Sequence, residues 1–533
     1  MKKIQLVIST ILLLVLCGCS GVGMRSTYWR NDDTGEWLIG LTEDNVIYDC
    51  KVWDIASKNE SDGVYSIEAQ YGSERLDISV GSEQGAKRTI TIGDKQFDCS
   101  IIDGHFLSDY PEKDTCVTIA DNHYAAGDSV TIVGWVKQKS GIFGFAKSKK
   151  NGKEVAVTRM ANILTGEEPT FTAPIDSLGR FVLRIPIENT TSFCLKVGQE
   201  TQEMAAEIVA EPNETYFLMI DKSQDKTLFM GKNARLQNEI NAHRILTPEY
   251  DATKLKEIGS SMMSILDSIR NNTKTSLQKL EDICLEHPTL SERYHTYYRN
   301  YIMVANAHSL MQRVHIMPNV ELLKHYSKAV DELNWKEFCE PYTINGYEFS
   351  LFLNDYVAFL QTKVEEKVDH TMTSILEAAE KDGVVKLSTK DREAIRQYDE
   401  AYPAYLEQRE NAPDSIQKAM DEEFGNNNYV KAVLEIQGRN PKYDEYALQK
   451  NLMRNTEQMV KEVNARRLSK VAKDIILCRY LYSNIDRIRK PLYKEIIDFA
   501  NKRIRIPAAR NVVHTINDKY EQICNDTIDN RGL

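Results

Sequence analysis

The feature that most constrains the fold is a change of hydrophobic periodicity near Gly231. Before this point, short segments alternate with the period of two expected of β-strands, as Val46, Tyr48, Cys50 and Val52 do. Beyond it, apolar residues recur at the three- and four-residue steps of an α-helix. The sequence therefore predicts a multidomain α+β protein, in which β modules precede a large all-α C-terminal region.

The β region divides into two antiparallel modules. Residues 28–118 have the pattern of a β-meander, with a hairpin that turns at Gly72 and Ser73. Residues 119–230 contain strands separated by polar turns, which is typical of a β-sandwich. Residues 231–533 then form the predicted helical domain.

Local signals support helices in this last region. Ser388 with Asp391 has the spacing of an N-terminal cap, and Thr289 with Glu292 has the spacing of a capping box. Residues 352–368 predict a long amphipathic helix. Four tyrosines allow two interpretations, a ligand groove or a helix face packed on its neighbour: Tyr294, Tyr297, Tyr298 and Tyr301.

The N-terminal segment has the order of a secretory signal peptide. Lys2 and Lys3 precede an apolar run that is shorter than the roughly 20 residues of a membrane-spanning helix. The run ends at Gly18-Cys19, which resembles a bacterial lipobox. We therefore expect a lipoprotein signal peptide over residues 1–18, lipidation of Cys19 and a tether over 19–27. The alternative is a plain signal peptide with incidental cysteines.

The remaining cysteines are widely spaced, and no C-x-x-C motif occurs. Cys50, Cys99 and Cys116 lie in one β region, where a disulfide among them is one interpretation and buried free thiols are the other. Cys524, near the C-terminus, is the candidate reactive thiol. Cys478 lies in an apolar helical segment and is assigned to the core.

Other chemistry finds little support in the sequence. The net charge of −11 argues against nucleic acid as a partner. His308 and His315 lack a nearby carboxylate, and H-E-x-x-H is missing, so no metal site is predicted. No phosphate-binding or serine-hydrolase motif occurs either, and we predict no catalytic residue and no cofactor.

Several segments resemble the N-terminal, non-catalytic region of TlpA-type, thioredoxin-like disulfide oxidoreductase lipoproteins of the Bacteroidetes. They are residues 28–32, 34–40, 49–53, 176–181, 209–214 and 229–234. The resemblance implies a cell-envelope setting and a lipid anchor. That family's W-C-x-x-C motif is missing from the sequence, so no catalytic cysteine is carried over. The tether also lacks the acidic cluster of many surface-exported relatives, which favours a membrane-anchored protein that faces the periplasm.

The preferred functional hypothesis is a lipid-anchored envelope protein without a catalytic site, acting as a periplasmic binding or scaffold module. Its predicted partners are the membrane, through Cys19, and an envelope protein, while the ligand stays unknown. The alternative is a component of a thiol-disulfide oxidoreductase system, acting with a separate thioredoxin-like chain or through an isolated cysteine. A third hypothesis, a small-ligand or peptide sensor, predicts an aromatic-lined pocket in the helical region.

Overall fold

A computed structural model describes residues 26–137, 155–198, 202–246, 262–312, 320–486, 488, 490–516, 518, 519 and 522. The chain forms two compact units. The first takes residues up to 161, 168–309 and 338–348, and the second takes 162–167, 310–337 and the residues from 349 onward. The predicted α+β organisation, strands first and helices after, is confirmed.

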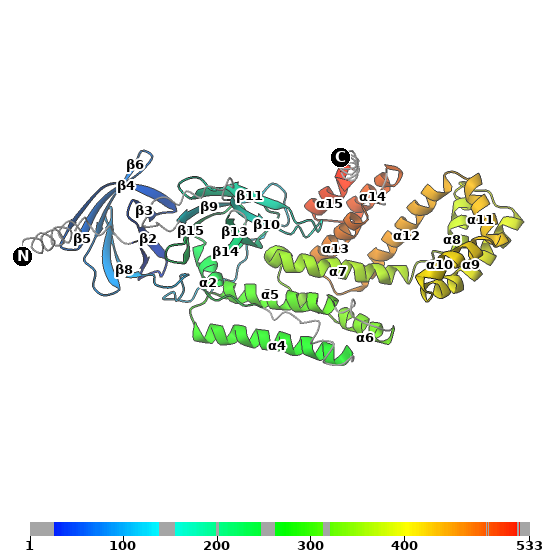
Figure 1. Cartoon of the computed structure of the whole chain (residues 1–533), viewed down its shortest axis with the longest axis horizontal. Helices are drawn as coiled ribbons and strands as arrows, with labels where there is room; N and C mark the ends of the chain where they lie inside the picture. Colours follow the sequence, from blue (N-terminus) through cyan, green and yellow to red (C-terminus); the bar gives the residue numbers. More distant parts are fainter. Residues whose placement is uncertain are drawn as a thin grey trace, which may run out of the picture. The chain divides into compact units, whose positions relative to one another are not determined.

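The predicted meander closes into an antiparallel barrel, in which each strand pairs with the next and β1 pairs with β8 (Figure 1). The hairpin at Gly72 is confirmed: Tyr71 pairs with Glu74, and Gly72 has a φ of +59°, which glycine adopts easily. The barrel strands are β1 Thr27–Asn31, β2 Trp37–Leu41, β3 Asn45–Tyr48, β4 Lys51–Ser61, β5 Val64–Tyr71, β6 Glu74–Val80, β7 Lys87–Ile92 and β8 Lys95–Ile101.

The predicted sandwich consists of two four-stranded sheets, ordered β11-β10-β13-β14 and β12-β9-β15-β16 (Figure 1). Strand β12 alternates strictly, burying Phe181, Leu183 and Ile185 while Val182 is 62% exposed. The sandwich strands are β9 Ser129–Lys137, β10 Val155–Arg159, β11 Thr170–Pro174, β12 Arg180–Pro186, β13 Thr191–Gly198, β14 Gln202–Ala210, β15 Thr215–Asp221 and β16 Lys226–Met230.

One pairing departs from the antiparallel pattern, because β15 runs parallel to β9. Strand β15 is also buried on both faces. Its Leu218 faces the sandwich core, while Phe217 and Met219 pack with Tyr28 and Trp37 of the barrel. The barrel and the sandwich therefore share an apolar interface within the first unit.

Helix α2 covers the edge strands of both sheets with side-chain amides. Gln237 donates to the carbonyl of Val209 and accepts from its N–H, at 2.7 and 2.9 Å. Asn238 does the same with Phe229 on β16, and Asn241 forms a similar pair on β14. These amides complete backbone hydrogen bonds that an edge strand otherwise leaves open.

The sequence changes from strands to helices at Gly231, but the boundary between the two compact units lies elsewhere. Helix α2 still belongs to the first unit.

The other helices follow in chain order. Ser388 and Asp391 form the predicted cap, a capping box at the start of α9. At α5, however, the hydroxyl that accepts from the N–H of Tyr294 belongs to Ser291 and not to the predicted Thr289, because the chain first turns through His287. The helices are α2 Ala234–Ala242, α4 Met262–Glu286, α5 Glu292–Met311, α6 Val320–Asp331, α7 Gly346–Glu365, α8 Met372–Lys381, α9 Thr389–Glu410, α10 Asp414–Gly425, α11 Asn428–Arg439, α12 Tyr443–Ala465, α13 Lys470–Ser483, α14 Lys490–Arg503 and α15 Pro507–His514, with 3-10 turns η2 Trp335–Glu337 and η3 Tyr342–Asn345.

The second unit is held together at its centre by Arg479 on α13, which is 2% exposed. The guanidinium donates to the carbonyls of Asn162 and Ile163 at 2.9 and 3.1 Å. It also donates to the Ser350 hydroxyl and the Asn354 side-chain oxygen on α7, each at 2.8 Å. Burial lowers the pKa of Arg479 to about 10. One side chain thus joins two helices and the turn over residues 162–167.

Among the described residues, no helix is both long enough and apolar enough to span a membrane.

Candidate functional site

The cysteines singled out from the sequence have separate locations. Cys19 and Cys524 lie outside the described residues. Cys50, Cys99 and Cys116 are free thiols: the first packs against Met230, the second faces the barrel interior, and the third is exposed. The structure therefore gives a disulfide among these three no support.

Burial disfavours the thiolate form at several of the described cysteines. It raises the pKa of Cys50 to about 11 and that of Cys99 to about 12. Cys194 and Cys284 each have a pKa raised to about 11 for the same reason. Cys478 is fully buried, as expected for a core residue. Because the thiolate is the reactive form, these positions do not suit thiol exchange.

Three of the four tyrosines of α5 are core residues, and Tyr301 is partly buried against the same apolar cluster. Tyr294, Tyr297 and Tyr298 are each 1% exposed or less. Tyr294 and Tyr298 donate their hydroxyls to the carbonyls of His243 and Ile240, at 2.6 and 3.1 Å. The alternative of a helix face packed on its neighbour is therefore the one that the structure supports.

An aromatic groove lies instead in the second unit, over helices α9, α10 and α11. Tyr398, Tyr402 and Tyr405 follow one face of α9 at steps of four and three residues, and Phe424 of α10 packs on the last of them. The rings form a stack: the centroids of Tyr405 and Phe424 are 4.0 Å apart, with an interplanar angle of 16°. All four rings are half-buried and line a groove of about 450 Å³.

Helix α11 supplies the other wall of this groove. Val430 and Val433 are buried beneath it, while Leu434 is 58% exposed at its edge. The nearby charges compensate each other, because Arg409 and Asp421 form an ion pair at 2.6 Å. This part of the surface therefore combines aromatic and aliphatic side chains with one ion pair, and its lining residues carry no unbalanced charge.

A second hollow of about 690 Å³ continues the groove and shares part of its lining. The shared residues are Met372, Tyr398, Tyr402 and Gln437. This second part is acidic: its described lining holds four carboxylates and neither lysine nor arginine. The carboxylates belong to Glu365, Asp369, Asp399 and Asp444. We call the two parts together the aromatic groove.

The acidic end is held in place by hydrogen bonds. Asp399 accepts from the backbone N–H groups of Met372 and Thr373 at 2.8 and 2.7 Å, so it caps the start of α8. Hydrogen bonds from Thr371 lower the pKa of Asp369, which keeps this carboxylate ionised. Glu365 and Asp444 are exposed. The groove therefore combines an apolar part with a negatively charged end.

A comparable cavity elsewhere in the second unit lacks this imbalance of charge. It has a volume of about 690 Å³ and lies beside Trp335 and Tyr356. Its Arg466 pairs with Asp331 at 2.6 Å, and its Glu462 pairs with Lys367 at 2.7 Å. Its other charged lining residues, Glu332 and Arg467, have opposite signs, so this cavity presents a smaller net charge to a ligand than the aromatic groove does.

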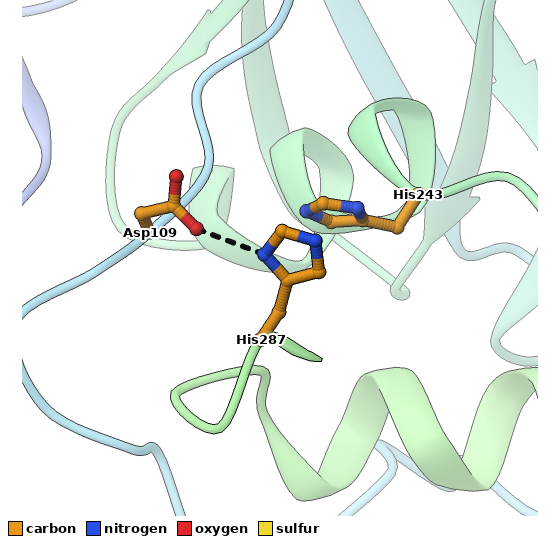
Figure 2. Close-up of side chains that lie close together, drawn as sticks. All are labelled: Asp109, His243 and His287. Carbon is orange, nitrogen blue, oxygen red and sulfur yellow. Dashed lines mark hydrogen bonds and ion pairs between the residues drawn. The ribbon is translucent and has the colours of Figure 1, made fainter. Parts of the chain in front are cut away.

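The first unit contains a group of side chains of the kind that hold metal ions. Asp109, His243 and His287 each bring one ligand atom within 4.8 Å of the others. Figure 2 shows the two imidazole rings beside the carboxylate. Burial, with His287 nearby, lowers the pKa of His243 to about 4. Sequence reasoning missed this group because its members are far apart in the chain.

Comparison with known proteins identifies no family. No family model matches the sequence, and no curated protein matches it. One similar solved structure is that of a Bacteroides ovatus protein provisionally described as a cell adhesion protein. It is 8% identical, covers 40% of this chain and 88% of its own, and has a TM-score of 0.14. So low a TM-score carries no argument about fold or function.

Proposed function

We propose that this protein is a lipid-anchored component of the cell envelope whose helical region binds a polypeptide segment with apolar and basic side chains. The anchor is Cys19, as the signal-peptide pattern and the resemblance to TlpA-type lipoproteins suggest. The observation that carries the binding proposal is the aromatic groove, because it joins an aromatic and aliphatic wall to an end lined by four carboxylates, of which, in the described part of the chain, only Asp369 has an arginine, Arg454, against it. No catalytic residue is assigned.

The ring geometry favours a polypeptide over a sugar. Sugars are bound by the free faces of aromatic rings. Here Tyr398 stacks on Tyr402 with centroids 5.0 Å apart, and Tyr405 stacks on Phe424 at 4.0 Å, so the rings cover much of each other's faces. What remains is a surface of ring edges and aliphatic side chains beside the Arg409–Asp421 ion pair. Such surfaces accept the apolar side chains of a helix or strand.

The negative charge at the acidic end of the groove indicates which charged side chains the bound segment carries. Four carboxylates line this end, and two of them, Glu365 and Asp444, are exposed to an incoming ligand. Opposite charge mainly steers association and sets orientation, while buried apolar contact supplies most of the affinity. We therefore expect the bound segment to place lysine or arginine beside its apolar residues.

The first test uses a synthetic amphipathic peptide with leucine at i, i+3, i+4 and i+7 and lysine elsewhere. We expect this peptide to bind the full chain in fluorescence anisotropy, and the matched peptide with glutamate in place of lysine not to bind. Leu434→Glu should weaken binding by at least about tenfold, since it puts a charge on the apolar wall. Because Leu434 is 58% exposed, the fold should tolerate this change.

The matched control is Ile416→Glu. Ile416 is 48% exposed on α10, and it is not a lining residue of the groove. It should leave the affinity unchanged. Equal binding of the lysine and glutamate peptides, or equal losses in the two variants, would count against the proposal.

A further inference from the structure

We propose that Asp109, His243 and His287 bind a divalent transition-metal ion of the zinc class, in a site separate from the aromatic groove. Two imidazole nitrogens and one carboxylate oxygen are a donor set that suits zinc. Magnesium and calcium prefer sites made of oxygen ligands, so this group should discriminate against them.

The present distances are close to those that such an ion requires. Nδ1 of His287 lies 3.1 Å from Oδ1 of Asp109, and the ligand atoms of all three residues lie within 4.8 Å of one another. With metal–nitrogen bonds of 2.0–2.1 Å in a tetrahedral site, neighbouring ligand atoms are about 3.3 Å apart. Small side-chain adjustments therefore bring all three ligands around one ion (Figure 2).

The backbones of the two histidine ligands are each fixed by a different helix end. His243 follows α2, where its N–H donates to the Glu239 carbonyl at 3.0 Å. His287 follows α4, and its N–H donates to the carbonyl of Ile283 at 2.9 Å. Asp109 lies in the segment after the barrel. The backbones of the two histidines are thus held in place before any ion arrives, which lowers the entropic cost of binding.

An unpartnered nitrogen provides a second, independent reason. Nε2 of His243 is buried and has no hydrogen-bond partner. A buried polar atom without a partner is costly, and native proteins rarely leave one. A metal ion bound at this imidazole would satisfy a lone pair of the ring.

The site is open to solvent on one side. The side chain of His287 is 31% exposed and that of Asp109 is 64% exposed. An ion can therefore enter without unfolding the unit. A water molecule would complete the coordination, since three protein ligands leave one tetrahedral position open.

The test is a titration of the purified full chain with Zn²⁺ in competition with a chromophoric chelator. We expect one ion per chain, no displacement by excess Mg²⁺, and the visible absorption bands of a tetrahedral complex when Co²⁺ replaces Zn²⁺. Mutation of a residue that only hydrogen-bonds to a metal ligand typically lowers metal affinity by about 10–100-fold. Removal of a ligand itself, in His243→Ala or His287→Ala, should therefore weaken binding by at least about 100-fold. Asp109→Asn should weaken it as well.

His295→Ala is the matched control. His295 on α5 pairs with Glu281 on α4 at 2.8 Å. It lies outside the metal-type cluster, so this variant should bind Zn²⁺ normally. Circular dichroism of each variant checks that the fold persists, and His243→Gln replaces His243→Ala if that variant unfolds. No binding to the native chain, or equal binding by native, His243 and His287 variants, would overturn the proposal and leave an ordinary hydrogen-bonded cluster.

Discussion

Replacing Arg479 by methionine is expected to destabilise the second unit by about 3 kcal/mol. The change removes the donors to the Ile163 carbonyl and to the Asn354 side chain, whereas the Asn162 carbonyl keeps its hydrogen bond from the Gly166 N–H at 2.8 Å. Each orphaned buried acceptor costs about 1–3 kcal/mol, and relief from burying a charge offsets part of the sum. Urea denaturation followed by circular dichroism at a helix-sensitive wavelength measures the loss.

Two further variants sharpen this test. Arg467 is exposed on the same unit, so Arg467→Met should change the stability by no more than about 0.5 kcal/mol. Gly166 has a φ of +84°, and a Cβ there would lie 2.6 Å from the Arg479 guanidinium carbon, so Gly166→Ala should also destabilise. An Arg479→Met variant as stable as the native chain would show that this hydrogen-bond network contributes little.

Replacing Cys19 by serine is expected to move the protein almost completely from the membrane fraction to the soluble fraction of the envelope. A lipidated cysteine with two or more acyl chains anchors a protein stably, at about 0.8 kcal/mol per buried CH₂ group. Serine offers no thiol for acylation. Fractionation of cells that express each variant, followed by immunoblotting, measures the redistribution.

Cys17→Ser is the matched control for this experiment. Cys17 lies two residues earlier but follows Leu16 rather than a small residue, so its replacement should leave the protein in the membrane fraction. If the Cys19 variant remained in the membrane, or if both variants left it, lipidation at Cys19 would be the wrong explanation of the N-terminal pattern.

Local sequence signals predicted the elements well but not their closure. Alternation along the strands and the turn at Gly72 indicate a meander, and both depend on neighbouring residues. The alternation from Val46 to Val52 predicted one strand, however, and this was wrong: Asp49 and Cys50 both have positive φ and form a turn, so that β3 and β4 pair as a hairpin. Closure depends on the pairing of Trp29 with Ile101 and of Asn31 with Cys99, which are about seventy residues apart in the chain. No local pattern encodes such a contact.

The aromatic groove illustrates the same limit. Tyr294, Tyr298 and Tyr301 have the same spacing as Tyr398, Tyr402 and Tyr405. On α5, the first two of these tyrosines are fully buried, whereas on α9 the rings stay half-exposed beside α10 and α11. The spacing identifies a helix face in both cases. Only the packing of neighbouring helices decides whether that face becomes core or the wall of a groove.

The cluster of Asp109, His243 and His287 could not be predicted from the sequence. His243 and His287 are more than forty residues apart, and Asp109 belongs to the segment after the barrel. Metal motifs are recognised from sequence when ligands follow one another at short, fixed spacings. Here the packing of α2 and α4 brings the ligands together, so the signal appears only in three dimensions.

Photo-crosslinking tests the central claim, polypeptide binding in the aromatic groove, most directly. A photoreactive leucine analogue in the leucine–lysine peptide marks the residues that it contacts on the full chain, and mass spectrometry locates them. The account predicts crosslinks concentrated on α8, α9 and α11, including Met372, Tyr402 and Leu434. Crosslinks spread over the surface, or concentrated in the first unit, would contradict it.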